Sequence, residues 1–74
     1  MTHLKWQHHI KRRYYCVFLS RDLLGDWVVT KSWGGLDNAT GRVVHIACSS
    51  MDEANTLLEK ITAVRKKRGY ILCS

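Results

Sequence analysis

Cysteines, acidic residues and long apolar runs are all scarce in this chain of 74 residues. The three cysteines include no CxxC pair, so they are too few and too poorly spaced for a disulfide framework or a structural zinc site. We expect Cys16 and Cys48, which lie in apolar runs, to be buried thiols in a reducing compartment. No window approaches the roughly 20 apolar residues of a membrane span, and the N-terminal residues contain no apolar signal core. These absences predict a cytoplasmic protein that does not bind membranes.

The shortage of acidic residues leaves the chain strongly basic. Asp and Glu total 6 against 12 Lys and Arg, which gives a formal net charge of +6. Such a surface attracts polyanions, above all nucleic acids and acidic proteins. The hydrophobic content of 46% and the charged content of 24% are ordinary for a globular protein. We therefore expect one small folded domain, monomeric, with a modest core.

Side chains suited to catalysis or metal binding are poorly arranged. His45 and Cys48 are near in sequence, but a strand would direct them to opposite faces, and no third group is evident to orient a base. His3, His8 and His9 lack the rigid scaffold that a metal site needs. The sequence therefore predicts no enzyme activity, no metal and no cofactor.

Strand-forming residues are concentrated between residues 14 and 49. YYCVFLS (14–20), WVVTKSW (27–33) and RVVHIACS (42–49) are rich in β-branched and aromatic types. A turn-forming cluster separates the first two, which predicts an antiparallel hairpin. The polar loop at 34–41 lacks the Lys-Ser/Thr pair and the helix of a phosphate-binding loop. In the third strand, alternation sends two sets to opposite faces: Val44, Ile46 and Cys48 one way, and Val43, His45 and Ala47 the other.

The segment SSMDEANTLLEKITAVRKKRGY has the features of an amphipathic helix. Ser50 and Glu53 form a capping-box pattern, and the basic run 65–68 followed by Gly69 is typical of a helix end. We predict a helix from about Ser50 to Arg68 and a short closing strand at 70–73. One apolar stripe runs along this helix, formed by Ala54, Leu57, Leu58, Ile61 and Val64.

Together these elements predict an α+β fold of order β-β-β-α, with a fourth strand at the end. The helix would cover one face of a three- to four-stranded antiparallel sheet. Residues 1–12 contain several cations and no acid, and Leu4 and Ile10 fit no helical face. We expect a basic, flexible N-terminal arm at 1–12 and the folded domain at 13–74.

Four segments follow one another along the chain: RDLLGDWVVTKSWGG, GR, SSMDEANTLLEKI and RKKRGY. In this order and spacing the chain resembles a WGR domain over roughly residues 14 to 71. The family pattern joins an aromatic strand, WGRIG, a glycine-containing loop, a Ser-x-x-Glu-Ala helix start and a Lys-rich turn before Gly-Tyr. Here the triplet reads Trp33-Gly34-Gly35, so the arginine is missing, and the loop from Leu36 to Gly41 is a residue longer.

This resemblance implies a nucleic-acid-binding module, with DNA favoured over RNA. The family helps poly(ADP-ribose) polymerases to recognise DNA ends, and it also occurs as short bacterial stand-alone proteins of similar size to this chain. Polymerase activity is not implied, because no catalytic domain is present. The family's tryptophan lies near the DNA, and this role carries over to Trp33, whereas the arginine's role is lost at Gly35.

The candidate residues each have a second interpretation. Trp33 is either a stacking platform, worth roughly 1–3 kcal/mol per base, or a core residue packed beside Gly34. Arg42 is either a phosphate ligand or a solvated strand end. The basic run 65–68 either contacts phosphate or compensates the helix dipole. The candidate interface consists of Lys31, Trp33, Gly34, Arg42, Arg65, Lys66, Lys67 and Arg68.

Two functions from different classes remain open. The first is nucleic-acid binding, mainly through the phosphate backbone and without base-specific reading, because no recognition helix can be identified. The alternative is a protein-interaction module that binds an acidic partner through the same cations.

Overall fold

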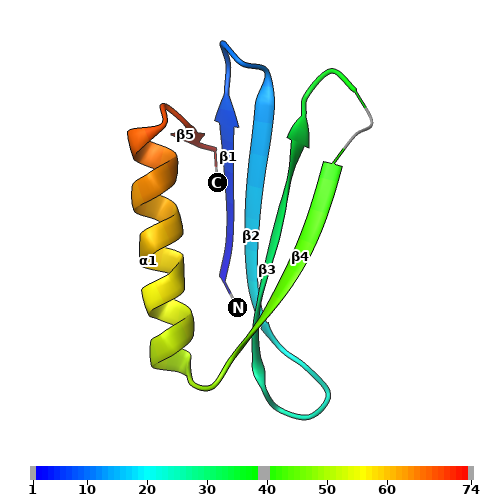
Figure 1. Ribbon diagram of the computed structural model, residues 1–74, viewed down its shortest axis with the longest axis vertical. Helices are drawn as coiled ribbons and strands as arrows, with labels where there is room; N and C mark the ends of the chain where they lie inside the picture. Colours follow the sequence, from blue (N-terminus) through cyan, green and yellow to red (C-terminus); the bar gives the residue numbers. More distant parts are fainter. Residues whose placement is uncertain (1, 39–40, 74) are drawn as a thin grey trace.

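The computed structural model describes residues 2–38 and 41–73 and contains, in that part of the chain, five strands and one helix (Figure 1). All neighbouring strands are antiparallel, and their order is β4-β3-β2-β1-β5. The predicted α+β class is confirmed. Residues 39 and 40, which belong to the predicted polar loop, lie outside the described residues. The elements are β1 (Thr2–His8), β2 (Arg13–Arg21), β3 (Trp27–Gly35), β4 (Gly41–Cys48), α1 (Met51–Lys67) and β5 (Ile71–Leu72).

The N-terminal segment is a strand of the sheet, so the flexible arm predicted for residues 1–12 is wrong. β1 pairs with β2 along its whole length and with β5 through Trp6 and Leu72. The Trp6 side chain lies in the core, with 3% of the residue exposed. Burial of an indole contributes a large apolar area, which anchors β1 in the sheet. The sheet consequently has five strands rather than three or four, and residues 9–12 form the turn between β1 and β2.

The helix begins and ends where its sequence predicts. The Ser50 hydroxyl accepts a hydrogen bond of 3.1 Å from the Glu53 amide, and the Glu53 carboxylate accepts in turn from Ser49. These bonds satisfy amides that the first turn leaves without helical partners. At the other end Gly69 has a φ of +85°, a value that favours glycine, and the chain leaves the helix there. The Tyr70 amide then donates to the Arg65 carbonyl at 3.0 Å, which directs Tyr70 back toward the sheet.

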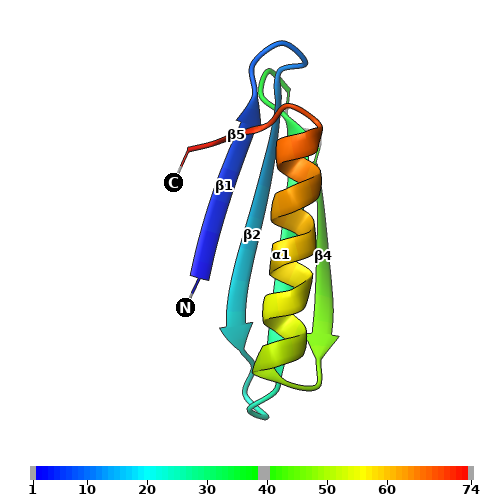
Figure 2. The ribbon, with the colours of Figure 1, turned by 90° about the vertical axis from the view of Figure 1, so that its left-hand side faces the viewer.

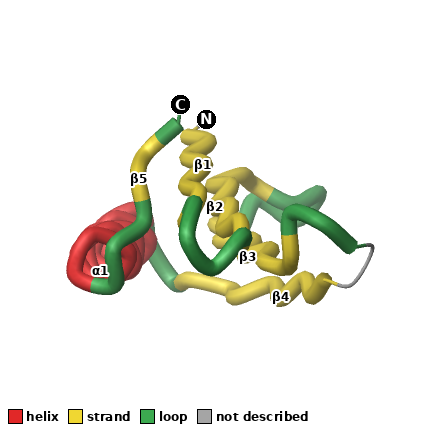
Figure 3. Tube along the Cα trace, turned by 90° about the horizontal axis from the view of Figure 1, so that it is seen from above, coloured by secondary structure: helices red, strands yellow, loops and turns green. Residues whose placement is uncertain are grey.

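The core lies between α1 and one face of the sheet, as Figures 2 and 3 show. The helix stripe is buried at Ala54, Leu58 and Ile61, whereas Val64, near the helix end, is 40% exposed. Val44, Ile46 and Cys48 share one face of β4, as predicted; on this face Cys48 is buried and Ile46 half-buried, whereas Val44 is 39% exposed. Cys16, which we expected to be buried, lies on the other face of the sheet and is only half-buried. The buried core residues are Trp6, Tyr15, Val17, Leu19, Val29, Cys48, Ala54, Leu58 and Ile61.

Candidate nucleic-acid interface

Charge is distributed unevenly along the molecule, whose longest dimension is 39 Å. The β1–β2 turn, the start of β4 and the C-terminal end of α1 lie at one end, while the β2–β3 turn and the start of α1 lie at the other (Figure 1). The first end, called the basic end below, carries the cations of segments 11–13, 42 and 65–68. The opposite end carries most of the acids, namely Asp22, Asp26, Asp52 and Glu53. This separation concentrates positive potential at the basic end.

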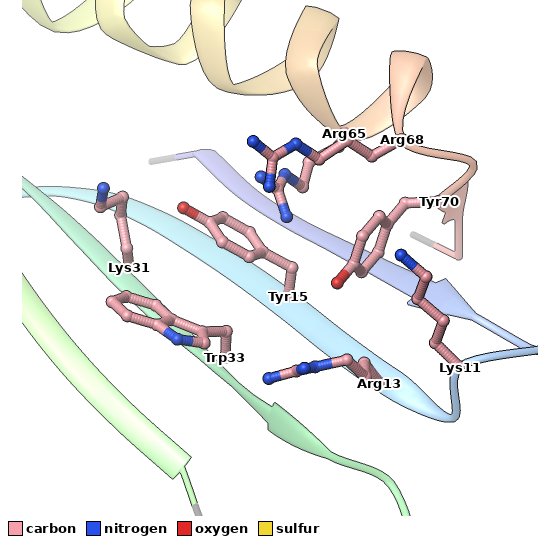
Figure 4. Close-up of a pocket in the computed structure, with 8 residues that line it drawn as sticks. All are labelled: Lys11, Arg13, Tyr15, Lys31, Trp33, Arg65, Arg68 and Tyr70. Carbon is pink, nitrogen blue, oxygen red and sulfur yellow. The ribbon is translucent and has the colours of Figure 1, made fainter.

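A cavity of about 350 Å³ opens at the basic end, between α1 and the sheet (Figure 4). Cationic and aromatic side chains dominate its lining, and no acidic side chain of the described residues contributes to it. Its composition suits a ligand that is anionic and also has a flat ring. The lining consists of Lys11, Arg13, Tyr15, Lys31, Trp33, Arg65, Arg68 and Tyr70. We call this space the basic cavity.

Sheet register and helix periodicity bring these side chains together. Tyr15 of β2 pairs with Trp33 of β3, and because directly opposed residues share a face, both rings lie on the side toward α1. Arg13 and Lys31 lie two residues from this pair on their own strands and face the same way. Residues three apart on a helix are neighbours, which places Arg65 beside the Arg68 side chain. The cavity is therefore built from segments that are distant in the sequence.

Flat groups are stacked along one side of the basic cavity. The Tyr15 and Trp33 rings lie 5.9 Å apart between centroids, with an interplanar angle of 14°. The guanidinium carbon of Arg65 lies 4.1 Å from the centroid of Tyr15 and 4.9 Å from that of Tyr70. Each such cation–π contact contributes about 0.5–2 kcal/mol, depending on its desolvation. The half-buried Trp33 ring packs against the core and also lines the cavity, so its role as a stacking platform stays a prediction.

Arg65 is held firmly while its charge remains uncompensated. Its Nε is buried and has no hydrogen-bond partner in the described part of the chain. The only ion pair within residues 2–38 and 41–73 joins Arg12 to Asp37, so no carboxylate neutralises Arg65. A planar guanidinium fixed between two rings presents its remaining donors with little conformational freedom to lose on binding.

The Arg12–Asp37 ion pair neutralises one cation of the basic end. The Arg12 Nε and Nη2 atoms donate to the two Asp37 carboxylate oxygens at 3.0 and 2.9 Å. The hydrogen bonds from the Arg12 side chain lower the pKa of the Asp37 carboxyl. The Leu36 amide also donates to the Arg12 carbonyl at 2.8 Å, which ties the β1–β2 turn to the end of β3. Arg12 is thus structural, whereas its neighbour Arg13 lines the cavity.

A smaller depression of about 180 Å³ adjoins the basic cavity, because Arg13 and Trp33 line both. Its other lining residues are Gly34, Gly35, Gly41 and Arg42. Arg42 is the direct cross-strand partner of Trp33, and the Lys31 ammonium lies 5.8 Å from the centroid of the Trp33 ring. A Cβ at Gly35 would lie 2.7–3.0 Å from the side-chain amide of Asn38, so a larger residue requires that side chain to move.

The structure brings together six of the eight predicted interface residues. Lys31, Trp33, Arg65 and Arg68 line the basic cavity, and Gly34 and Arg42 join Trp33 in the adjoining depression. Lys66 instead lines a separate depression with Glu59, and Lys67 is exposed. The basic run is divided because successive residues of a helix point in directions about 100° apart. Four further lining residues, which are Lys11, Arg13, Tyr15 and Tyr70, are not among the predicted interface residues.

Comparisons with protein-family models, curated proteins and solved structures gave no significant match to this chain. Within the described ranges, no group of three or more His, Cys, Asp or Glu side chains is arranged to hold a metal ion. The helix at Met51–Lys67 is too short and too polar to cross a bilayer, and no other helix is found among the described residues.

Proposed function

We propose that this chain is a non-enzymatic nucleic-acid-binding module whose basic end contacts the phosphate backbone. The observation that carries the proposal is the basic cavity, in which five cationic and three aromatic side chains converge without an acid among the described lining residues. Contacts between Lys or Arg and phosphate supply most of the affinity of non-specific complexes. They also position a protein without reading sequence, which fits the lack of a recognition helix.

Individual residues take distinct parts in the proposed complex. Arg65 offers a forked donor to a phosphate, because two rings hold its guanidinium in place. Arg13, Lys31, Arg42 and Arg68 line the basic cavity or the adjoining depression and extend the positive surface. Trp33 meets a sugar or base, a contact worth roughly 1–3 kcal/mol per base.

The resemblance to WGR domains supports the same function. The family's tryptophan matches Trp33, which lies at the point shared by the basic cavity and the adjoining depression. In this proposal the chain is a WGR-type protein that prefers DNA to RNA. Gly35 leaves the depression without the family's cation, so phosphate binding is weaker than in relatives that have the arginine.

A salt titration tests the proposed function. Binding of a labelled duplex and a labelled single strand is followed by fluorescence anisotropy between 50 and 200 mM salt. We expect the logarithm of the binding constant to fall linearly with the logarithm of salt concentration. The Arg68→Ala variant should reduce the slope by about 0.7–0.9, the effect of one lost phosphate contact. Lys67→Ala, which removes the same charge one residue away, is the matched control and should change the slope less.

Two outcomes would contradict nucleic-acid binding through this site. Equal slopes for Arg68→Ala and Lys67→Ala would place the contacts outside the basic cavity. Absence of binding to both probes at 50 mM salt would instead favour the alternative function, an interaction with an acidic protein.

A further inference from the structure

We infer that the basic cavity receives an unpaired nucleotide, so that the protein prefers single-stranded nucleic acid to a closed duplex. This inference rests on the proposed function and deepens it, since phosphate contacts alone do not distinguish single from double strands.

The composition of the cavity is the first argument. Flat aromatic groups and cations line the same concave space, with Trp33 and Tyr70 half-buried on either side of the buried Tyr15 ring. A closed duplex presents phosphates on its outside and keeps the faces of its bases stacked in its interior. An unpaired nucleotide presents a phosphate and a π-face together, and proteins bind such strands by combining a positive groove with stacking side chains.

The size of the cavity is the second argument. Its volume of about 350 Å³ lies at the lower end of the range of roughly 300–1,000 Å³ that is typical of small-ligand sites. A concavity of this size between α1 and the sheet can enclose one nucleotide, whereas the convex surface of a double helix can meet only its rim. The shape of the cavity therefore favours a nucleotide whose base is not stacked inside a double helix.

The position of Arg65 is the third argument. Its guanidinium already lies against Tyr15 and Tyr70, so the site is organised before a ligand binds. The buried Nε without a partner and the absence of a neutralising carboxylate in the described residues leave a fixed positive charge inside the cavity. Guanidinium planes also stack on bases, so Arg65 can hold either the phosphate or the base of the same nucleotide.

The depression along α1 that Lys66 lines lacks this combination of cations and aromatic rings. Lys66 lines its depression with Asn55, Leu58, Glu59, Thr62 and Ala63, which include an acid and no aromatic residue. Lys66 therefore supplies positive charge without an aromatic neighbour in its depression, whereas the basic cavity combines five cations with Tyr15, Trp33 and Tyr70.

Three probes of equal phosphate number test the inference with the wild-type chain at one salt concentration. They are a single-stranded DNA, the same strand with abasic sites in place of its nucleotides, and a duplex whose ends are closed by non-nucleotide linkers. We expect the intact single strand to bind on the order of tenfold more tightly than either of the others, because only it offers accessible bases.

The outcomes separate this inference from the proposed function. Equal binding of the intact and abasic strands, or binding of the closed duplex at least as tight as that of the single strand, would overturn the preference for an unpaired nucleotide while nucleic-acid binding stands. If none of the probes binds at low salt, both proposals are overturned.

Two variants locate the preference within the cavity. Trp33→Leu should remove most of the difference between the intact and abasic strands. Trp27→Leu is the matched control. Trp27 is another half-buried tryptophan of β3, and the guanidinium of Arg21 lies 4.8 Å from its ring. Trp27 does not line the basic cavity. Thermal unfolding of each variant establishes that it is folded, and Tyr70→Ala provides a second test if Trp33→Leu unfolds. An unchanged preference in a folded cavity variant would contradict the inference.

Discussion

The guanidinium carbon of Arg65 lies 4.1 Å from the centroid of the Tyr15 ring, so a cation from the end of α1 rests on an aromatic residue of β2. Tyr15 in turn stacks on Trp33, which extends the contact to β3. This arrangement positions a positive charge without neutralising it, because the rings attract the cation and leave its donors other than the buried Nε available for an anion.

The Arg65→Lys variant should weaken nucleic-acid binding on the order of tenfold, because lysine keeps the charge but loses the planar fork and the stacking. The measurement is fluorescence anisotropy at fixed salt, with thermal unfolding as a check on the fold. Arg21→Lys is the matched control, since Arg21 also lies over an aromatic ring, that of Trp27, but at the end of β3 far from the basic cavity. A similar loss of affinity in both variants would argue against a specific role for Arg65.

The Gly35→Arg variant should bind nucleic acid more tightly and with a steeper salt dependence, because it restores a cation beside Trp33. One additional phosphate contact should increase the slope by about 0.7–0.9 in a logarithmic salt plot. The new side chain must displace the Asn38 amide, which is a flexible group rather than backbone. Gly35→Ala introduces the same crowding without the charge and should leave the salt slope unchanged. An unchanged slope in Gly35→Arg would mean that no phosphate passes this depression.

The Trp6→Ala variant should lower the free energy of unfolding by about 3–5 kcal/mol, the usual cost of truncating a buried tryptophan. Trp6 packs in the core at 3% exposure, so this result would establish β1 as part of the folded unit. Chemical denaturation measures the change. Ile10→Ala, at a position that is 90% exposed, serves as the control and should be nearly neutral. A neutral Trp6→Ala would return residues 2–8 to the status of a flexible arm.

The start of α1 should make stability depend on acid pH. Hydrogen bonds from the Ser49 side chain and amide lower the pKa of Glu53 below its ordinary value of 4.5. A group whose pKa is lowered by folding stabilises the protein above the unfolded value, and that contribution is lost as the pH falls through the folded one. Glu53→Gln should therefore show a flatter fall in melting temperature between neutral and acid pH than the wild type. Asp52→Asn removes a charge from the same turn without touching these bonds and should retain the wild-type slope.

Local signals in the sequence were sufficient for much of the fold. The helix followed from its apolar period, the Ser50 cap and the Gly69 stop, all of which act within a few residues. The strand at Thr2–His8 was missed although Leu4, Trp6 and His8 alternate with polar residues, which is the period of a half-buried strand. Its position at the chain end and its basic composition favoured a flexible arm, and burial of Trp6 outweighed both.

The site was only partly predictable because it depends on long-range register. The spacing of three residues between Arg65 and Arg68 predicts that their side chains lie on one face of the helix end. The same helical period directs Lys66 and Lys67 to other faces. By contrast, Tyr15 reaches Trp33 only through the pairing of β2 with β3, which the composition of the two strands does not determine. Tyr70 joins them because the chain turns back at Gly69.

The central claim, that the basic end of the molecule binds nucleic acid through its aromatic-lined cavity, is tested most directly by NMR. Backbone amide signals of the labelled protein are followed while a short single-stranded DNA is added at low salt. The account predicts shifts concentrated at residues 11–15, 31–35 and 65–70, with little change at the 22–26 turn and in the first turn of α1. Shifts spread evenly over the surface, shifts centred on the acidic end, or none at all would contradict it.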